Sequence, residues 1–104
     1  MAWILLIVAG LLEIVWAFTM KMSEGFSRLW PSVVTLVAMA ASFALLSLAM
    51  RSLPLGTAYT IWTGIGAVGA FLVGIIVLGE AASPMRVLAA VMIVGGLVLM
   101  KASA

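Results

Sequence analysis

The stretch that decides the fold is residues 2–20, which read AWILLIVAGLLEIVWAFTM. Glu13 is the one charged side chain in this run, and its neighbours are apolar, aromatic or small. With a rise of about 1.5 Å per residue, Glu13 lies about 16 Å into a helix that starts near Ala2, close to the midplane of a hydrocarbon core about 30 Å thick. An ionisable group at that depth is energetically costly, so it indicates an ion or proton pathway.

The composition around this stretch excludes several classes of protein. The chain has 104 residues, of which 67% are hydrophobic and only 8% are charged, whereas a soluble domain carries about 25% charged residues. With no cysteine and no histidine, the chain lacks disulfides and the usual zinc or haem ligands, and we expect neither a metal nor a cofactor. Its five Lys/Arg residues are too sparse for a nucleic-acid surface. An enzyme is also not expected, because no nucleophile–base pair is visible.

Charged residues and turns divide the chain into four apolar runs. The expected fold class is therefore an all-α membrane protein, with one transmembrane domain over residues 1–104 and four helices at about 2–20, 30–50, 55–78 and 84–101. Ser83 and Pro84 form an N-cap and first helical position for the last run. That run is shorter between its charges, and an interfacial helix is the alternative. Its apolar residues cover all sides, which favours a spanning helix.

The distribution of basic residues predicts the topology. Four spans place both termini on one side of the membrane, together with Arg51 and Lys101, and leave Lys21, Arg28 and Arg86 on the other. This difference is a weak orientation signal under the positive-inside rule, so we expect insertion in both orientations. A fixed topology is the alternative. Because four thin helices cannot enclose a hydrated path, two oppositely inserted copies are expected to form an antiparallel, dual-topology homodimer surrounded by lipid.

Two residues at helical spacing from Glu13 are candidates for its immediate surroundings. Gly10 leaves space beside the carboxylate, and Trp16 offers an indole N–H and a π face. The alternative for Trp16 is an interfacial anchor, although its depth favours the site. In the second run, Ser42 is a buried polar residue that could orient Glu13 or bond its own backbone one turn back.

The third run adds aromatic and small residues. Tyr59 and Trp62 lie three apart on one face, and aromatic faces attract cations by about 2 kcal/mol when desolvated. With one carboxylate, they form a plausible pocket for a cation that carries N–H donors. Gly64 and Gly66 predict a bend or a close helix crossing.

The fourth run has small residues but no charge in its interior. Ala89 and Gly96 are seven residues apart and therefore share one face of a helix. We interpret this face as a packing seam between protomers, and assign the run to assembly rather than to chemistry.

These features together resemble the small multidrug resistance transporters over essentially the full chain. The matching parts are the central Glu13, residues 21–33 (KMSEGFSRLWPSV), residues 54–66 (PLGTAYTIWTGIG) and the four-helix length. Within that family, the EIVWA run that starts at Glu13 is similar to the guanidinium-exporter branch, as are Gly10 and Lys101.

The resemblance implies an antiparallel homodimer in the bacterial inner membrane that exports guanidinium and small guanidinyl or related cations in exchange for H⁺. It implies that Glu13 carries either the proton or the substrate. It also implies a hydrogen-bonding surround of Glu13, formed by Trp16, Ser42, Tyr59 and Trp62. As a mechanism, we expect the indole N–H groups of the two tryptophans to orient the carboxylate. Thr60 stands where many relatives have Ala, which is a mild departure.

Other functions remain open at this point. A broad exporter of quaternary ammonium and other lipophilic cations would depend on aromatic and apolar surface, because such cations donate no hydrogen bonds. A cation channel built from the same helices would conduct without a proton gradient. A structural membrane subunit would leave the cost of burying Glu13 unexplained.

Overall fold

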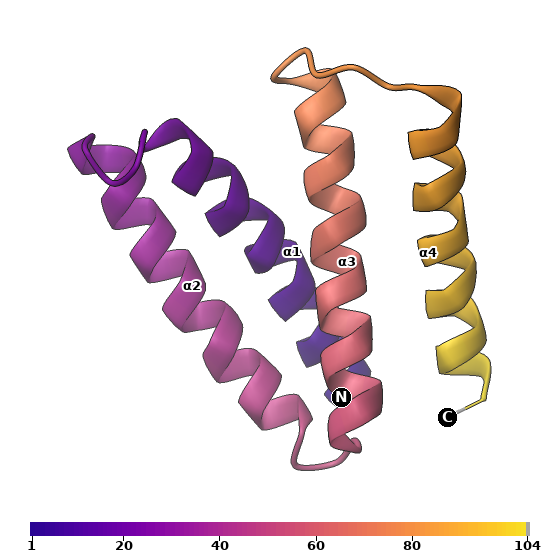
Figure 1. Cartoon of the computed structure of the whole chain (residues 1–104). Helices are drawn as coiled ribbons and strands as arrows, with labels where there is room; N and C mark the ends of the chain where they lie inside the picture. Colours follow the sequence, from indigo (N-terminus) through magenta and orange to yellow (C-terminus); the bar gives the residue numbers. More distant parts are fainter. Residues whose placement is uncertain (104) are drawn as a thin grey trace.

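A computed structural model describes residues 1–103, which form four α-helices joined by short turns (Figure 1). The helices are α1 (Ala2–Met22), α2 (Leu29–Ala49), α3 (Leu55–Ile76) and α4 (Pro84–Ala102). Each contains 19 to 22 residues and is long and apolar enough to cross a membrane, since about 20 residues span about 30 Å. Each end lies within two residues of the position expected from the sequence.

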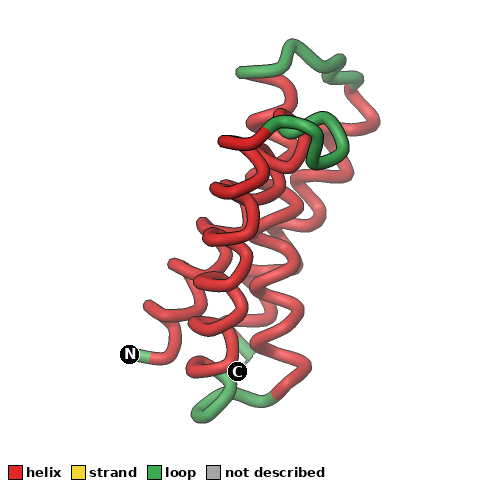
Figure 2. The backbone as a smooth tube through the Cα atoms, turned by 90° about the vertical axis from the view of Figure 1, so that its left-hand side faces the viewer, coloured by secondary structure: helices red, strands yellow, loops and turns green. Residues whose placement is uncertain are grey.

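The helices form a thin slab that measures 40 × 34 × 16 Å. α1 packs against α2 and α3, and within residues 1–103 the helix contacts of α4 are with α3 (Figure 1). Both chain ends and the α2–α3 turn lie at one end of the slab, and the other two turns lie at the opposite end (Figure 2). The slab is therefore little thicker than one helix, whose diameter is about 10–12 Å, and one chain encloses little volume of its own.

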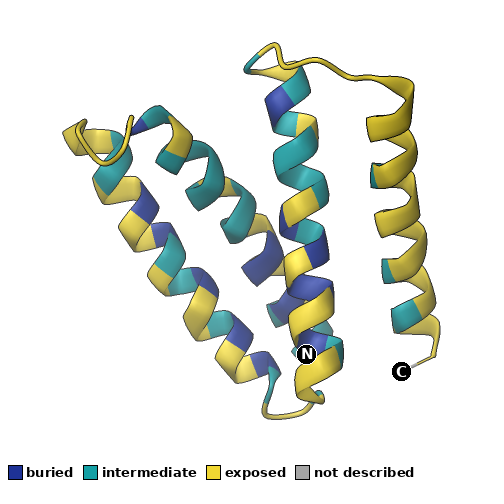
Figure 3. Ribbon diagram, in the orientation of Figure 1, coloured by how far each residue is buried: buried dark blue, intermediate teal, exposed yellow. Residues whose placement is uncertain are grey.

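Most of the buried residues lie where α1, α2 and α3 face one another (Figure 3). The core is a small set of apolar residues on these three helices: Leu6, Ala9, Leu46, Ala49, Ala58, Ile61 and Trp62. α4 has no buried residue in the described chain, and large side chains such as Leu99 are 70% exposed. This apolar surface requires either lipid or another protein as its neighbour.

The small residues of α4 lie on this exposed helix. Ala89 and Gly96 are both exposed, and a Cβ added at Gly96 would have no atom within 4 Å. Gly96 also lines a cavity of about 500 Å³ between α3 and α4. Within one chain this face is unpacked, so its predicted packing against a second protomer stays a prediction.

Local hydrogen bonds account for the start of α4 and the pairing of α1 with α2. The Ser83 hydroxyl accepts a 3.2 Å bond from the Arg86 N–H and Pro84 follows it, which confirms the predicted N-cap. The hydroxyl oxygens of Thr19 on α1 and Thr35 on α2 share a hydrogen bond of 2.7 Å. Such a bond links membrane helices that apolar side chains alone do not hold in one register.

Candidate functional site

Glu13 lies midway along α1, with its carboxyl group against the backbone of α3. A Cβ added at Gly66 would collide with the carboxyl carbon and Oε1 of Glu13. Oε1 is buried and has no hydrogen-bond partner within residues 1–103. The absence of a side chain at Gly66 therefore makes room for the carboxyl group of Glu13. One of the carboxyl oxygens is left without a hydrogen-bond donor in the described chain.

Trp16 follows Glu13 by one helical turn and carries a second unpaired polar atom. Its indole Nε1 is buried and has no acceptor among the described residues. A buried donor and a buried acceptor without partners are each costly, typically by about 1–3 kcal/mol. Their proximity on one helix indicates a site that a polar ligand or a group from another chain can complete.

Ser42 joins three helices at a fully buried point. Its hydroxyl donates a 2.7 Å hydrogen bond to the Ala9 carbonyl on α1 and accepts a 2.9 Å hydrogen bond from the Trp62 indole N–H on α3. The serine proton thus goes to another helix rather than to the backbone of α2. The Trp62 N–H also donates to Ser42, whereas the expected mechanism had it orient Glu13.

Aromatic rings connect the same three helices. The Tyr59 and Trp62 ring centroids are 5.5 Å apart, those of Trp62 and Phe43 are 5.6 Å apart, and those of Phe43 and Trp16 are 6.4 Å apart. Tyr59 and Phe43 are each about half exposed. The row of rings therefore presents an open aromatic surface beside the polar link, and aromatic faces of this kind attract cations.

The sequence did not single out Phe43 for this role. An aromatic residue on a membrane helix suits contact with lipid as well as contact with a ligand, so its type carried no signal. Its position directly after Ser42 was the available hint, because Ser42 is a buried polar residue in the middle of α2.

Several glycines of α1 and α3 lie at close contacts between helices. The space at Gly10 is filled by Ile65, whose side-chain atoms lie 2.7–3.2 Å from the position of an added Cβ, rather than left open beside Glu13. Gly64 faces Leu97 on α4, while Gly66 faces Glu13 on α1. α3 continues as one helix through both glycines, so the structure assigns them to close packing with α4 and α1 respectively.

Comparison with known proteins identifies the family of this chain. Residues 1–94 match the sequence model of the family described as Small Multidrug Resistance protein. The chain belongs to the small multidrug resistance family. This confirms the resemblance found in the sequence.

Individual relatives match the whole chain. A protein of Salmonella typhimurium (strain LT2) named guanidinium exporter is 60% identical over 104 residues, which cover 100% of this chain and 99% of the relative. A guanidinium exporter of Yersinia pseudotuberculosis is 59% identical over 101 residues, 97% of each chain. A guanidinium exporter of Escherichia coli (strain K12) is 58% identical over 103 residues, with 99% and 98% covered.

Family membership and the four spans identify a multi-pass membrane protein of a transporter family rather than an enzyme. This small multidrug resistance protein carries one charged side chain, Glu13, far from the ends of its apolar helices. The candidate site is centred on that side chain. Glu13 does not line the cavity at Trp3 and Lys101, the cavity at Lys21 and Glu80, or the cavity at Tyr59 and Gly96.

Proposed function

We propose that this protein exports guanidinium and small guanidinyl cations across the bacterial inner membrane in exchange for protons, with Glu13 as the group that both ions share. The observation that carries the proposal is the buried, unpaired Oε1 of Glu13 in the middle of α1. The whole-chain similarity to proteins named guanidinium exporters supports the choice of cation.

The chemistry of the two ions makes their binding mutually exclusive. A carboxylate binds planar guanidinium through two parallel N–H···O hydrogen bonds, and a carboxylic acid does not. Glu13 thus carries either the proton or the cation. If the site opens to one side of the membrane at a time, this exclusion becomes exchange of one ion for the other.

The surrounding groups suit the remaining surfaces of guanidinium. Besides the Glu13 carboxylate, the hydroxyl of the half-exposed Tyr59 is an acceptor for N–H groups, whereas the Ser42 hydroxyl is fully buried and already bonded to Ala9 and Trp62. The rings of Trp16 and Trp62 offer faces on which the cation can stack. A quaternary ammonium ion has no N–H donor and would leave these acceptors without a partner, so we favour guanidinium.

An antiparallel homodimer completes the proposed site. The single chain leaves α4 unburied and the aromatic row open, and its basic residues set no strong orientation. A second, oppositely inserted copy would cover α4 through the face that contains Ala89 and Gly96. It would also bring a second Glu13 to the same site.

The test is ion exchange by the full chain in proteoliposomes. An outward guanidinium gradient is expected to drive proton uptake by the wild type, measured with a trapped pH indicator. Glu13→Gln keeps the shape of the side chain and is expected to abolish this movement. Glu24→Gln is the matched control, because Glu24 lies in the α1–α2 turn outside the helices, and it is expected to transport normally.

Two results would overturn the proposal. Normal proton-coupled guanidinium transport by Glu13→Gln would exclude Glu13 as the shared group. Guanidinium currents that far exceed transporter turnover and need no counter-movement of protons would instead identify a cation channel.

A further inference from the structure

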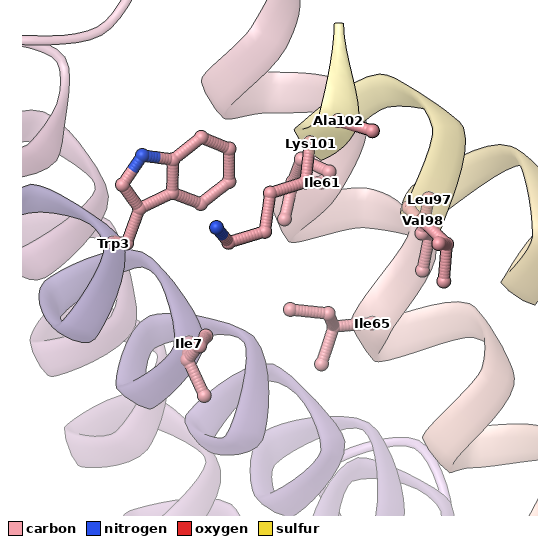
Figure 4. Close-up of a pocket in the computed structure, with 8 residues that line it drawn as sticks. All are labelled: Trp3, Ile7, Ile61, Ile65, Leu97, Val98, Lys101 and Ala102. Atoms are coloured by element: carbon pink, nitrogen blue, oxygen red, sulfur yellow. The ribbon is translucent and has the colours of Figure 1, made fainter. Parts of the chain in front are cut away.

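An apolar groove separate from Glu13 opens between α1, α3 and α4. It has a volume of about 450 Å³ and lies at the end of the slab where both termini meet (Figures 2 and 4). Its lining is apolar except at one end, and consists of Trp3, Ile7, Ile61, Ile65, Leu97, Val98, Lys101 and Ala102.

The polar end of the groove is cationic. The Lys101 ammonium lies 4.7 Å from the centroid of the Trp3 ring, and the two side chains point toward one another across the groove (Figure 4). The ring positions the ammonium without neutralising it, and leaves N–H donors available. None of the eight lining residues in the described chain is acidic, and the acidic residues of the turns, Glu24 and Glu80, belong to the opposite end of the slab.

The apolar part of the groove runs from this end toward the middle of the membrane. Ile7 lies one helical turn beyond Trp3, and Leu97 one turn before Lys101, so the groove extends about 6 Å along the helices. Apolar cavities of about 150 Å³ hold a benzene molecule, so a groove of this size has room for a stretch of hydrocarbon chain. Ile7 and Val98 are 45% and 65% exposed, which leaves the groove open to the bilayer.

From this juxtaposition we infer that the groove binds an anionic phospholipid, whose phosphate contacts Lys101 and whose acyl chain lies along Ile7, Ile65 and Leu97. The reason is complementarity at both ends. A membrane lipid carries its charge at the interface and its hydrocarbon toward the midplane, and basic pockets between membrane helices bind anionic headgroups. The inference does not depend on which cation the protein transports.

The test is native mass spectrometry of the full chain, released from micelles that contain equal amounts of phosphatidylglycerol and phosphatidylcholine. One basic residue near an anionic headgroup predicts about a fivefold preference for phosphatidylglycerol in the wild type. Lys101→Gln is expected to lose this preference and Lys101→Arg to keep it. Arg51→Gln is the matched control, because Arg51 lies in the α2–α3 turn at the same end but outside the groove. It is expected to behave as wild type.

A second variant tests the apolar part. Val98→Phe narrows the groove from its exposed side and is expected to reduce retention of both lipids. An unchanged preference in Lys101→Gln, an equal loss in Arg51→Gln, or unchanged retention in Val98→Phe would each overturn the inference. So would a wild-type dimer that retains no lipid, because a second copy would then cover the groove.

Discussion

The indole N–H of Trp62 donates a 2.9 Å hydrogen bond to the hydroxyl of Ser42, whose own proton goes to the Ala9 carbonyl on α1. Ala9 lies one turn before Glu13, so this chain of two bonds connects α3 to the part of α1 that carries the carboxyl group. In lipid, apolar packing between helices lacks a hydrophobic driving force. A polar link is therefore well suited to set how α1 faces α3 near Glu13.

Ser42→Ala removes this link and leaves the Trp62 N–H buried without an acceptor. Hydrogen bonds between membrane helices contribute about 1–2 kcal/mol, so we expect the free energy of unfolding in detergent to fall by about that amount. Guanidinium transport should fall as well, because α1 and α3 lose their common register at Glu13. Thermal unfolding and proteoliposome flux measure the two effects.

Ser47→Ala is the matched control for this substitution. Ser47 lies on the same helix but is exposed, so its replacement should leave both stability and flux near the wild-type values. If Ser42→Ala and Ser47→Ala behave alike, the three-helix link has no role in holding the site.

Gly66→Ala introduces a methyl group where the carboxyl group of Glu13 now lies. Either Glu13 or α3 must move, and a shift of about 1 Å in a reacting group is enough to lower activity by about a hundredfold. We expect a loss of guanidinium affinity of about tenfold or more, measured by titration calorimetry. Gly56→Ala on the same helix has no atom within 4 Å of the added Cβ, and should bind as wild type. Equal affinities for the two variants would show that the contact at Gly66 is unimportant.

The four helices were predictable because the bilayer imposes a simple rule on sequence. A span needs about 20 apolar residues, and charged residues and turns end it, so the helix limits follow from where Lys21, Arg51 and Ser83 stand. The carboxylate at Glu13 was equally visible, because the cost of an ionisable group in hydrocarbon makes a single one informative.

The contacts of these helices were not predictable to the same degree. Each helix is apolar on nearly all sides, so no hydrophobic stripe fixes its rotation about its own axis. The sequence therefore could not decide whether Gly10 or Gly66 lies against the carboxyl group, and the expectation that Gly10 leaves it space was wrong. The destination of the Ser42 proton depends on the same unknown rotation, which is why a local bond remained an alternative.

Competition between protons and guanidinium predicts the direction of a pH effect. Guanidinium binding requires Glu13 as a carboxylate, so binding releases a proton wherever the free site is protonated. Affinity should then weaken as pH falls, by at most about tenfold per pH unit for one proton. Titration calorimetry at several pH values measures the slope. In buffers of different ionisation enthalpy, the same experiment should show release of protons. An affinity that does not change with pH, with no release of protons, would show that protons and guanidinium do not compete for Glu13.

Dual insertion is testable because the chain has no native cysteine. Single cysteines at exposed positions, Ser52→Cys in the α2–α3 turn and Ala81→Cys in the α3–α4 turn, are expected to react with a membrane-impermeant thiol reagent from both sides of the membrane. About half of the copies should be labelled from each side, because the basic residues are nearly balanced.

Adding Ala82→Lys to each cysteine variant supplies the control for this balance. The extra charge strengthens the basic bias of the α3–α4 turn, so labelling should shift toward one side, in opposite directions for the two cysteines. An antiparallel dimer needs both orientations, so the biased chain should also lose guanidinium flux. Co-expression of a copy with the opposite bias should restore the flux, and a chain carrying Ser52→Lys and Arg86→Gln is such a copy. Labelling of each cysteine from one side alone in the unbiased chain would exclude the antiparallel arrangement, whatever the flux.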